Sequence, residues 1–170
     1  MELLIIRHAI AEDREAFART GQDDGLRPLT PGGARKMQRV ARGLVRAAPS
    51  LELLATSPLV RAVQTAEIVA AAYGVVEPLV IEQLTPEARP ADFLRWLRGR
   101  GARDALTIGA VGHEPALSTL ATWLLTGEEE SRVELKKGAA CLLRFDRRPA
   151  PGTATLVWAL APGHLRRLAS

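Results

Sequence analysis

The sequence predicts a three-layer α/β/α domain with a mostly parallel central sheet and an antiparallel hairpin at its C-terminal end. Short runs of apolar residues alternate with segments of helical periodicity along most of the chain. Such alternation is typical of a parallel sheet with helices on both faces. The last third changes to two strand-like runs joined by a turn containing Pro and Gly, which indicates a hairpin. The order of the strands does not follow from this pattern.

Each expected element is bounded by Gly, Pro or polar residues. Strands are expected at residues 3–6, 51–55, 77–82, 106–111, 138–145 and 153–160. Helices are expected at residues 31–48, 58–73, 91–97 and 115–126. Thr30-Pro31 and Ser57-Pro58 each suit a helix start, with a side-chain N-cap followed by proline. Residues 12–27 are expected to form a polar loop with about one helical turn, and residues 161–170 a short basic tail.

Length and composition fit one domain spanning residues 1–170. The chain has 170 residues, of which 47% are hydrophobic, enough for one ordinary core. No run of eighteen apolar residues occurs, so neither a transmembrane helix nor a signal peptide is expected. The single cysteine, Cys141, excludes an internal disulfide framework and favours a cytoplasmic location.

The net charge of +4 and the pI near 10.0 come almost entirely from arginine. The arginines are scattered along helical segments, whereas nucleic-acid binding requires a clustered basic face on a recognisable module. We interpret them as solvated helix faces, with a basic rim that attracts anionic substrates as the alternative. Three histidines and one cysteine at unrelated spacings form no metal-binding motif.

Three predicted strands end in residues that suit one shared site. The first strand runs into Arg7-His8, the second is followed by a helix with Arg61 in its first turn, and the fourth runs into His113. In a parallel sheet these ends share one edge, where ligands bind. Arginine forks and helix N-termini both favour phosphate there. The sequence therefore predicts a phosphate site, with histidine as its candidate nucleophile.

Four segments resemble the motifs of the histidine phosphatase superfamily, which has a phosphoglycerate mutase-like fold. Residues 4–9 carry the Arg-His pair, residues 56–66 the second arginine, and residues 111–115 the second histidine. Residues 27–33 are similar to the Arg-Pro-Leu-Thr element of the SixA-type phosphohistidine phosphatases. The segments stand in the family's order, and the length of the chain suits the SixA-like branch, which has no inserted cap domain.

The resemblance implies a two-step phosphoryl transfer without a metal or organic cofactor. His8 would attack phosphorus to form a phosphohistidine intermediate, which water then hydrolyses. Arg7, Arg61 and His113 would hold the phosphoryl oxygens and offset their charge. Arg27 is either a further substrate contact or a surface ion pair.

Two features depart from the family's pattern. Ala9 replaces the usual glycine after the histidine, so this turn must avoid positive φ or bear strain. Larger family members use a carboxylic acid after the third strand as proton donor; Glu82 and Glu87 are the candidates there, neither stands in a matched motif, and ordinary surface carboxylates are the alternative. A phosphohistidine substrate would relax the need for a donor, because imidazole leaves more readily than an alkoxide.

The expected function is a cytoplasmic phosphohistidine phosphatase acting on a phosphotransfer domain or relay protein in signal transduction. A small-molecule phosphomonoesterase of the same superfamily and a catalytically weak phosphate-binding module are the alternatives. A mutase is disfavoured because the chain is short for segments that enclose a substrate. The chain is expected to be a monomer or weak dimer that binds neither nucleic acid nor membrane.

Overall fold

A computed structural model describes residues 1–74, 77–100 and 106–170 of the chain. Its centre is a six-stranded sheet in the order β3-β2-β4-β1-β5-β6. The strands are β1 (Glu2–Arg7), β2 (Leu53–Thr56), β3 (Pro78–Val80), β4 (Thr107–Gly112), β5 (Ala140–Arg144) and β6 (Thr155–Leu160). Strands β1 to β4 pair in parallel, β5 is antiparallel to β1, and β6 is antiparallel to β5. The predicted fold class is confirmed.

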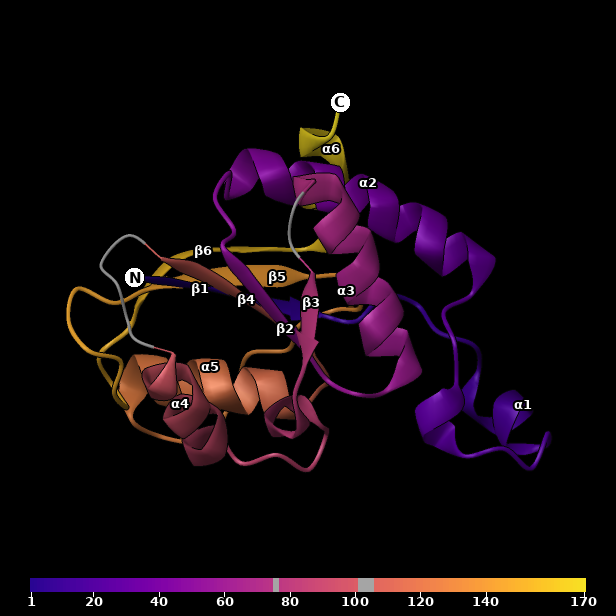
Figure 1. Ribbon diagram of the computed structural model, residues 1–170, viewed down its shortest axis with the longest axis horizontal. Coiled ribbons are helices and arrows are strands. Elements are labelled where there is room, and N and C mark those ends of the chain that lie inside the picture. Colours follow the sequence, from indigo (N-terminus) through magenta and orange to yellow (C-terminus); the bar gives the residue numbers. More distant parts are fainter. Residues whose placement is uncertain (75–76, 101–105) are drawn as a thin grey trace.

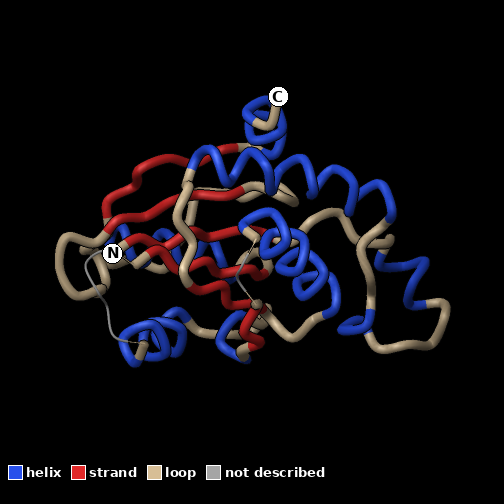
Figure 2. Tube along the Cα trace, turned by 45° about the horizontal axis from the view of Figure 1, so that its top comes forward, coloured by secondary structure: helices blue, strands red, loops and turns tan. Residues whose placement is uncertain are grey.

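Helices cover both faces of this sheet, with α2 and α3 on one side and α4 and α5 on the other (Figure 1). Figure 2 shows the strands running side by side between these layers. The helices are α1 (Arg14–Ala18), α2 (Pro31–Ala47), α3 (Val60–Tyr73), α4 (Pro90–Gly99), α5 (Ala116–Thr126) and α6 (Pro162–Leu168), with 3₁₀ turns η1 (Asp24–Leu26) and η2 (Glu82–Leu84). Within the described ranges, no helix is both long enough and apolar enough to cross a membrane.

Strand β1 is buried on both faces and divides the core into two parts. Leu3 and Ile5 belong to the cluster beneath α4 and α5, whereas Leu4 and Ile6 belong to the cluster beneath α2 and α3. All four side chains are fully buried. The continuous apolar run is therefore explained by a central strand whose alternate side chains face two helical layers.

The two predicted helix starts have different outcomes. Thr30 caps α2 as expected, because its hydroxyl accepts a hydrogen bond from the Gly33 amide at 2.9 Å. The prediction that Ser57 caps the next helix is wrong, since α3 begins at Val60 and has no side-chain cap. The Ser57 hydroxyl is committed instead to a histidine on the neighbouring strand end.

Residues 161–170 form more than a basic tail, because α6 packs closely against α2. Leu165 is fully buried in this contact. A Cβ built on Gly43 of α2 would lie 1.9 Å from the Leu165 carbonyl oxygen, so only glycine permits the approach. This helix brings the C-terminal end back over the α2 layer, as Figure 1 shows.

Candidate active site

The three predicted strand ends lie beside one another at the carboxyl edge of the sheet. The His8 amide donates to the Gly112 carbonyl at 3.0 Å, and the Ser57 amide donates to the Val111 carbonyl at 3.0 Å. These bonds continue the ladders of β1 and β2 onto β4 by one residue. The ring centroids of His8 and His113 are consequently 5.0 Å apart, with the rings inclined at 52°.

His8 is held as a neutral imidazole with one free nitrogen. Its Nδ1 lies 2.7 Å from the Ala9 carbonyl oxygen. Because a carbonyl oxygen only accepts, Nδ1 carries the proton and Nε2 keeps its lone pair. Burial lowers the pKa of His8 to about 4, with the Arg61 and Arg7 charges acting in the same direction. At neutral pH the ring therefore presents an unprotonated Nε2, as a nucleophile requires.

His113 is also neutral and is oriented by Ser57. Its Nε2 lies 2.9 Å from the Ser57 hydroxyl oxygen. Burial lowers the pKa of His113 to about 3, and the neighbouring His8, Arg61 and Arg7 reinforce the shift. The other ring nitrogen, Nδ1, is buried and has no hydrogen-bond partner within the described part of the chain.

Arg7 and Arg61 are each anchored by the ends of their guanidinium groups. One Arg7 Nη donates to the Leu135 carbonyl at 2.5 Å. Arg61 donates to the Asp24 carbonyl at 2.9 Å and pairs with the Asp24 carboxylate at 3.2 Å. Both arginines leave Nε buried without a partner among the described residues. Together with His113 Nδ1, three buried polar atoms without a partner in the described chain belong to residues that line the same cleft as His8, and such groups suit an oxyanion.

Ala9 fits its position without backbone strain. No described residue other than glycine has a positive φ, so this turn avoids the region that would demand glycine. The Ala9 amide donates to the Thr65 hydroxyl at 3.0 Å, and that hydroxyl donates to the Arg61 carbonyl at 2.7 Å. Thr65 therefore ties the loop after β1 to the first turns of α3, on which Arg61 stands.

Arg27 lies in the same cleft but two of its nitrogens are already engaged. Its Nε donates to the Asp24 carboxylate at 2.8 Å, and one Nη donates to the Glu12 carbonyl at 2.8 Å. Asp24 thus lies between Arg27 and Arg61, and the hydrogen bond from Arg27 is the main cause of the lowered pKa of its carboxyl. The structure shows an ion pair at Arg27, and a substrate contact there stays a prediction.

The two candidate proton donors occupy different places. Glu87 is exposed and lines the cleft. Glu82 begins η2 and is exposed, and it is not among the residues that line the cleft. Their role as proton donors stays a prediction.

The cleft around His8 has a volume of about 840 Å³ and opens to solvent. Its wall carries both signs of charge, from Arg14 and Lys137 as well as Asp13 and Asp23. Within the described ranges, no group of three His, Cys, Asp or Glu side chains is placed to hold a metal ion. The donors available in the cleft are those of histidine and arginine, which suit an anion.

Comparison with known proteins agrees with this geometry. A family model described as the histidine phosphatase superfamily (branch 1) matches residues 3–87, half of the chain. The chain belongs to this superfamily. An uncharacterized protein from Picosynechococcus is 41% identical over 145 residues, which is 85% of each chain. The membership predicted from the four motifs is confirmed.

Several solved structures share the fold of this chain. The protein histidine phosphatase SixA in complex with tungstate has a TM-score of 0.82 at 24% identity, with 97% of this chain and 99% of that chain covered. A phosphoserine phosphatase mutant from Entamoeba histolytica bound to phosphoserine has a TM-score of 0.69 at 18% identity, with 96% and 98% covered. An alpha-ribazole phosphatase from Shigella flexneri has a TM-score of 0.66 at 18% identity, with 95% and 97% covered.

Sequence reasoning did not single out three residues that the structure places at this cleft or beside its histidines. Asp24 sits in the polar loop before α2, and nothing in that loop indicates that it meets Arg61. Ser57 is part of a recognised motif, but its Ser-Pro pattern favours a cap. Glu114 follows His113 and lines the cleft. The one sequence signal for it is its position next to that histidine.

Proposed function

We propose that this protein is a phosphohistidine phosphatase that works through a covalent phosphohistidine on His8. The observation that carries the proposal is the neutral His8 ring, whose unprotonated Nε2 belongs to a residue that lines one cleft with Arg7, Arg61 and His113. In the first step Nε2 attacks phosphorus, and the bond to the leaving group breaks. In the second step water attacks phosphorus, and the bond to His8 breaks. The two arginines offset negative charge on the phosphoryl oxygens in both steps.

The preference for phosphohistidine is supported by two considerations. The likeness to SixA extends over nearly the whole of both chains, and SixA binds tungstate, an oxyanion shaped like phosphate. The cleft is open and about 840 Å³ in volume, which admits a phosphorylated side chain on a protein surface. The partner would be a phosphohistidine-bearing phosphotransfer domain or relay protein in the cytoplasm.

A small-molecule phosphomonoesterase is the second candidate, favoured by structural relatives that are phosphoserine and alpha-ribazole phosphatases. The two are separated by incubating the protein with a histidine-phosphorylated phosphotransfer domain and with a panel of phosphomonoesters. A kcat/KM at least about tenfold higher for the phosphoprotein supports the proposal. Equal or faster release from simple sugar phosphates would replace it with the esterase, and binding without any release would leave a phosphate-binding module.

A further inference from the structure

The protonation of the leaving group calls for a carboxyl that retains its proton at the edge of the phosphate site. Six carboxylates line the cleft: Glu12, Asp13, Asp23, Asp24, Glu87 and Glu114. Three are committed as acceptors: Asp13 to the Ala16 amide at 2.9 Å, Asp23 to the Gly25 amide at 2.8 Å, and Asp24 to two arginines. Glu12 and Glu87 are exposed to solvent. Glu114 is partly buried and pairs with no arginine within the described residues, and Ser118 lies beside its carboxyl with its hydroxyl and its amide as hydrogen-bond donors.

Glu114 stands directly after His113 on the loop that connects β4 to α5. Its Oε1 is fully buried and has no hydrogen-bond partner within the described residues. An unpaired buried carboxylate oxygen is costly, whereas a protonated carboxyl in the same place can serve as a donor. The position next to His113 puts this carboxyl on the wall of the cleft that contains His8.

The groups near Glu114 come from three neighbouring elements and the segment before β5. Arg7 approaches from β1, Ser118 from α5, Cys141 from β5, and Glu134 from the segment before β5. Burial is the main cause of a raised pKa at Glu114, and Glu134 acts in the same direction. Ser118 and Arg7 oppose the shift without reversing it. The net result is a carboxyl that holds its proton to higher pH than an ordinary glutamic acid.

The geometry points to Glu114 as the general acid and base of the reaction proposed above, on which this assignment rests. As His8 Nε2 bonds to phosphorus, the bond from phosphorus to the leaving atom breaks and takes its electron pair. Glu114 gives its proton to that atom and becomes a carboxylate. Water then attacks phosphorus and gives a proton to Glu114 as the bond to His8 breaks, so that phosphate leaves and both groups return to their starting states.

This role predicts a dependence on the leaving group that a merely structural role does not produce. An alkoxide needs a proton as it departs, whereas 4-nitrophenolate does not. A phosphohistidine imidazole can take a proton from solvent on its other nitrogen before it leaves. Loss of the acid should therefore harm alkyl phosphates most, phosphohistidine less and 4-nitrophenyl phosphate least.

The test compares kcat/KM of the wild-type protein and Glu114→Gln at pH 7 on ethyl phosphate, phenyl phosphate, 4-nitrophenyl phosphate and a histidine-phosphorylated protein. kcat/KM reports only the steps through transfer to His8, so slow hydrolysis of the intermediate does not mask the effect. Glu114→Gln is expected to lose about 10²–10⁴-fold on ethyl phosphate and less than about fivefold on 4-nitrophenyl phosphate. Retained 4-nitrophenyl phosphate activity also shows that the variant folds.

Two further variants keep the result interpretable. Glu128→Gln, which removes an exposed carboxylate in the loop after α5, is expected to match the wild type on every substrate. Glu87→Gln tests the competing assignment, and a leaving-group-dependent loss there but not in Glu114→Gln would overturn the proposal. A uniform loss on all substrates, or none, would also overturn it while leaving the phosphatase function intact. A wild-type protein inert on every substrate would remove both proposals together.

If Glu114→Gln does not fold, measurements on the wild-type protein alone test whether a general acid is present. With a general acid in place, wild-type kcat/KM should vary little across the three esters. A steep decrease from the 4-nitrophenyl to the ethyl ester would show that no proton is supplied and would contradict the assignment.

Discussion

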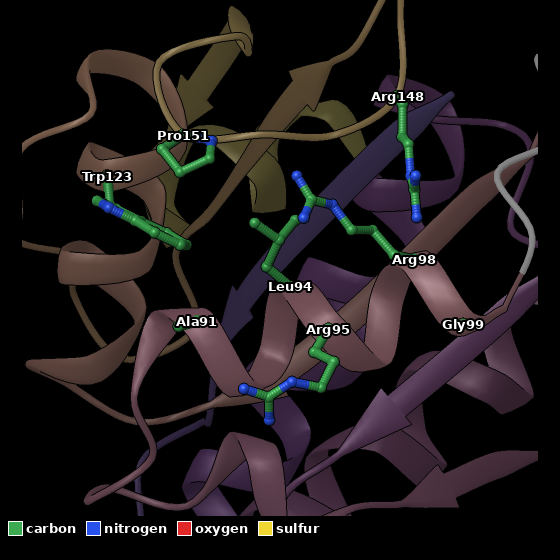
Figure 3. Close-up of a pocket in the computed structure, with 8 residues that line it drawn as sticks. All are labelled: Ala91, Leu94, Arg95, Arg98, Gly99, Trp123, Arg148 and Pro151. Carbon is green, nitrogen blue, oxygen red and sulfur yellow. The ribbon is translucent and has the colours of Figure 1, made fainter.

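Two arginine-rich cavities in this protein differ in how their arginines are held. The cleft at the carboxyl edge contains Arg7 and Arg61, and only 6% of the Arg61 side chain is exposed. The other cavity, about 570 Å³ in volume, lies against α4, α5 and the segment before β6 and contains Arg95, Arg98 and Arg148 (Figure 3). Both contain arginines, but only the cleft combines them with histidines.

The arginines of the second cavity are either solvated or satisfied. Arg95 is 76% exposed and pairs with Asp92 at 2.9 Å. Arg98 donates its Nε to the Pro149 carbonyl at 2.7 Å, and Arg148 is exposed. In the cleft, by contrast, the Nε atoms of both arginines are buried and unpaired among the described residues. Positive charge alone therefore does not mark a site, whereas buried donors without a protein partner indicate a missing ligand.

The largest expected effect is the loss of the nucleophile. Replacing His8 with alanine removes the unprotonated Nε2 that attacks phosphorus, so turnover should fall at least about 10⁴-fold. Steady-state hydrolysis of 4-nitrophenyl phosphate measures this loss, with circular dichroism as the check on folding. A variant that keeps a tenth of the wild-type rate would contradict the assignment of His8 as the nucleophile.

The second effect contrasts one arginine from each cavity. Arg61→Ala should lower kcat/KM by about 10²–10³-fold, because charge on the transferring phosphoryl group is no longer offset. Arg98→Ala, the matched change in the other cavity, should alter it by less than about twofold. Similar losses in both variants would show that the contrast between buried and satisfied arginines is mistaken.

A smaller effect concerns the stability of the loop after β1. Thr65→Val keeps the shape of the side chain but leaves the buried Ala9 amide without its acceptor, at a cost of about 1–3 kcal/mol in the free energy of unfolding. Thr122→Val on α5, where the hydroxyl bonds to half-buried Ser131 at 2.8 Å, should cost less. Urea titration of both variants measures the difference, and an equal cost would argue against a special role for Thr65.

A last effect concerns the dependence of stability on pH through the two histidines. Folded His8 and His113 should titrate with pKa values of about 4 and about 3, below the ordinary 6.5. Between these folded pKa values and 6.5, the unfolded chain binds more protons than the folded chain. The stability that the two neutral rings contribute is therefore present above about pH 6.5 and is lost as the pH falls toward 4. NMR titration of the ring protons checks this, and midpoints near 6.5 for both rings would contradict the burial argument.

The fold and the core of the site were largely predictable because their signals are local. The four-residue apolar run of β1 and the cap at Thr30 need no knowledge of the rest of the chain. The burial of Leu165 against Gly43 depends on a contact between distant segments, so the sequence predicts only a basic tail where α6 lies. The strand order likewise depends on packing, which the alternation of elements leaves undetermined.

The same distinction holds within the site. His8, Arg7, Arg61 and His113 stand in recognisable motifs, and the parallel sheet explains why they meet. Asp24 pairs with a residue far along the sequence, and no local pattern indicates this. The unpaired oxygen of Glu114 is a property of its surroundings, which only the structure shows.

The most direct test of the central claim is to trap the covalent intermediate. The wild-type protein is mixed with a histidine-phosphorylated protein or 4-nitrophenyl phosphate, quenched in alkali within a fraction of a turnover, and mapped by mass spectrometry. The account predicts one phosphoryl group on His8 that is stable to alkali and labile to acid, and none on Arg61→Ala in the same time. A phosphoryl group on any other residue, or turnover with His8 never modified, would contradict it.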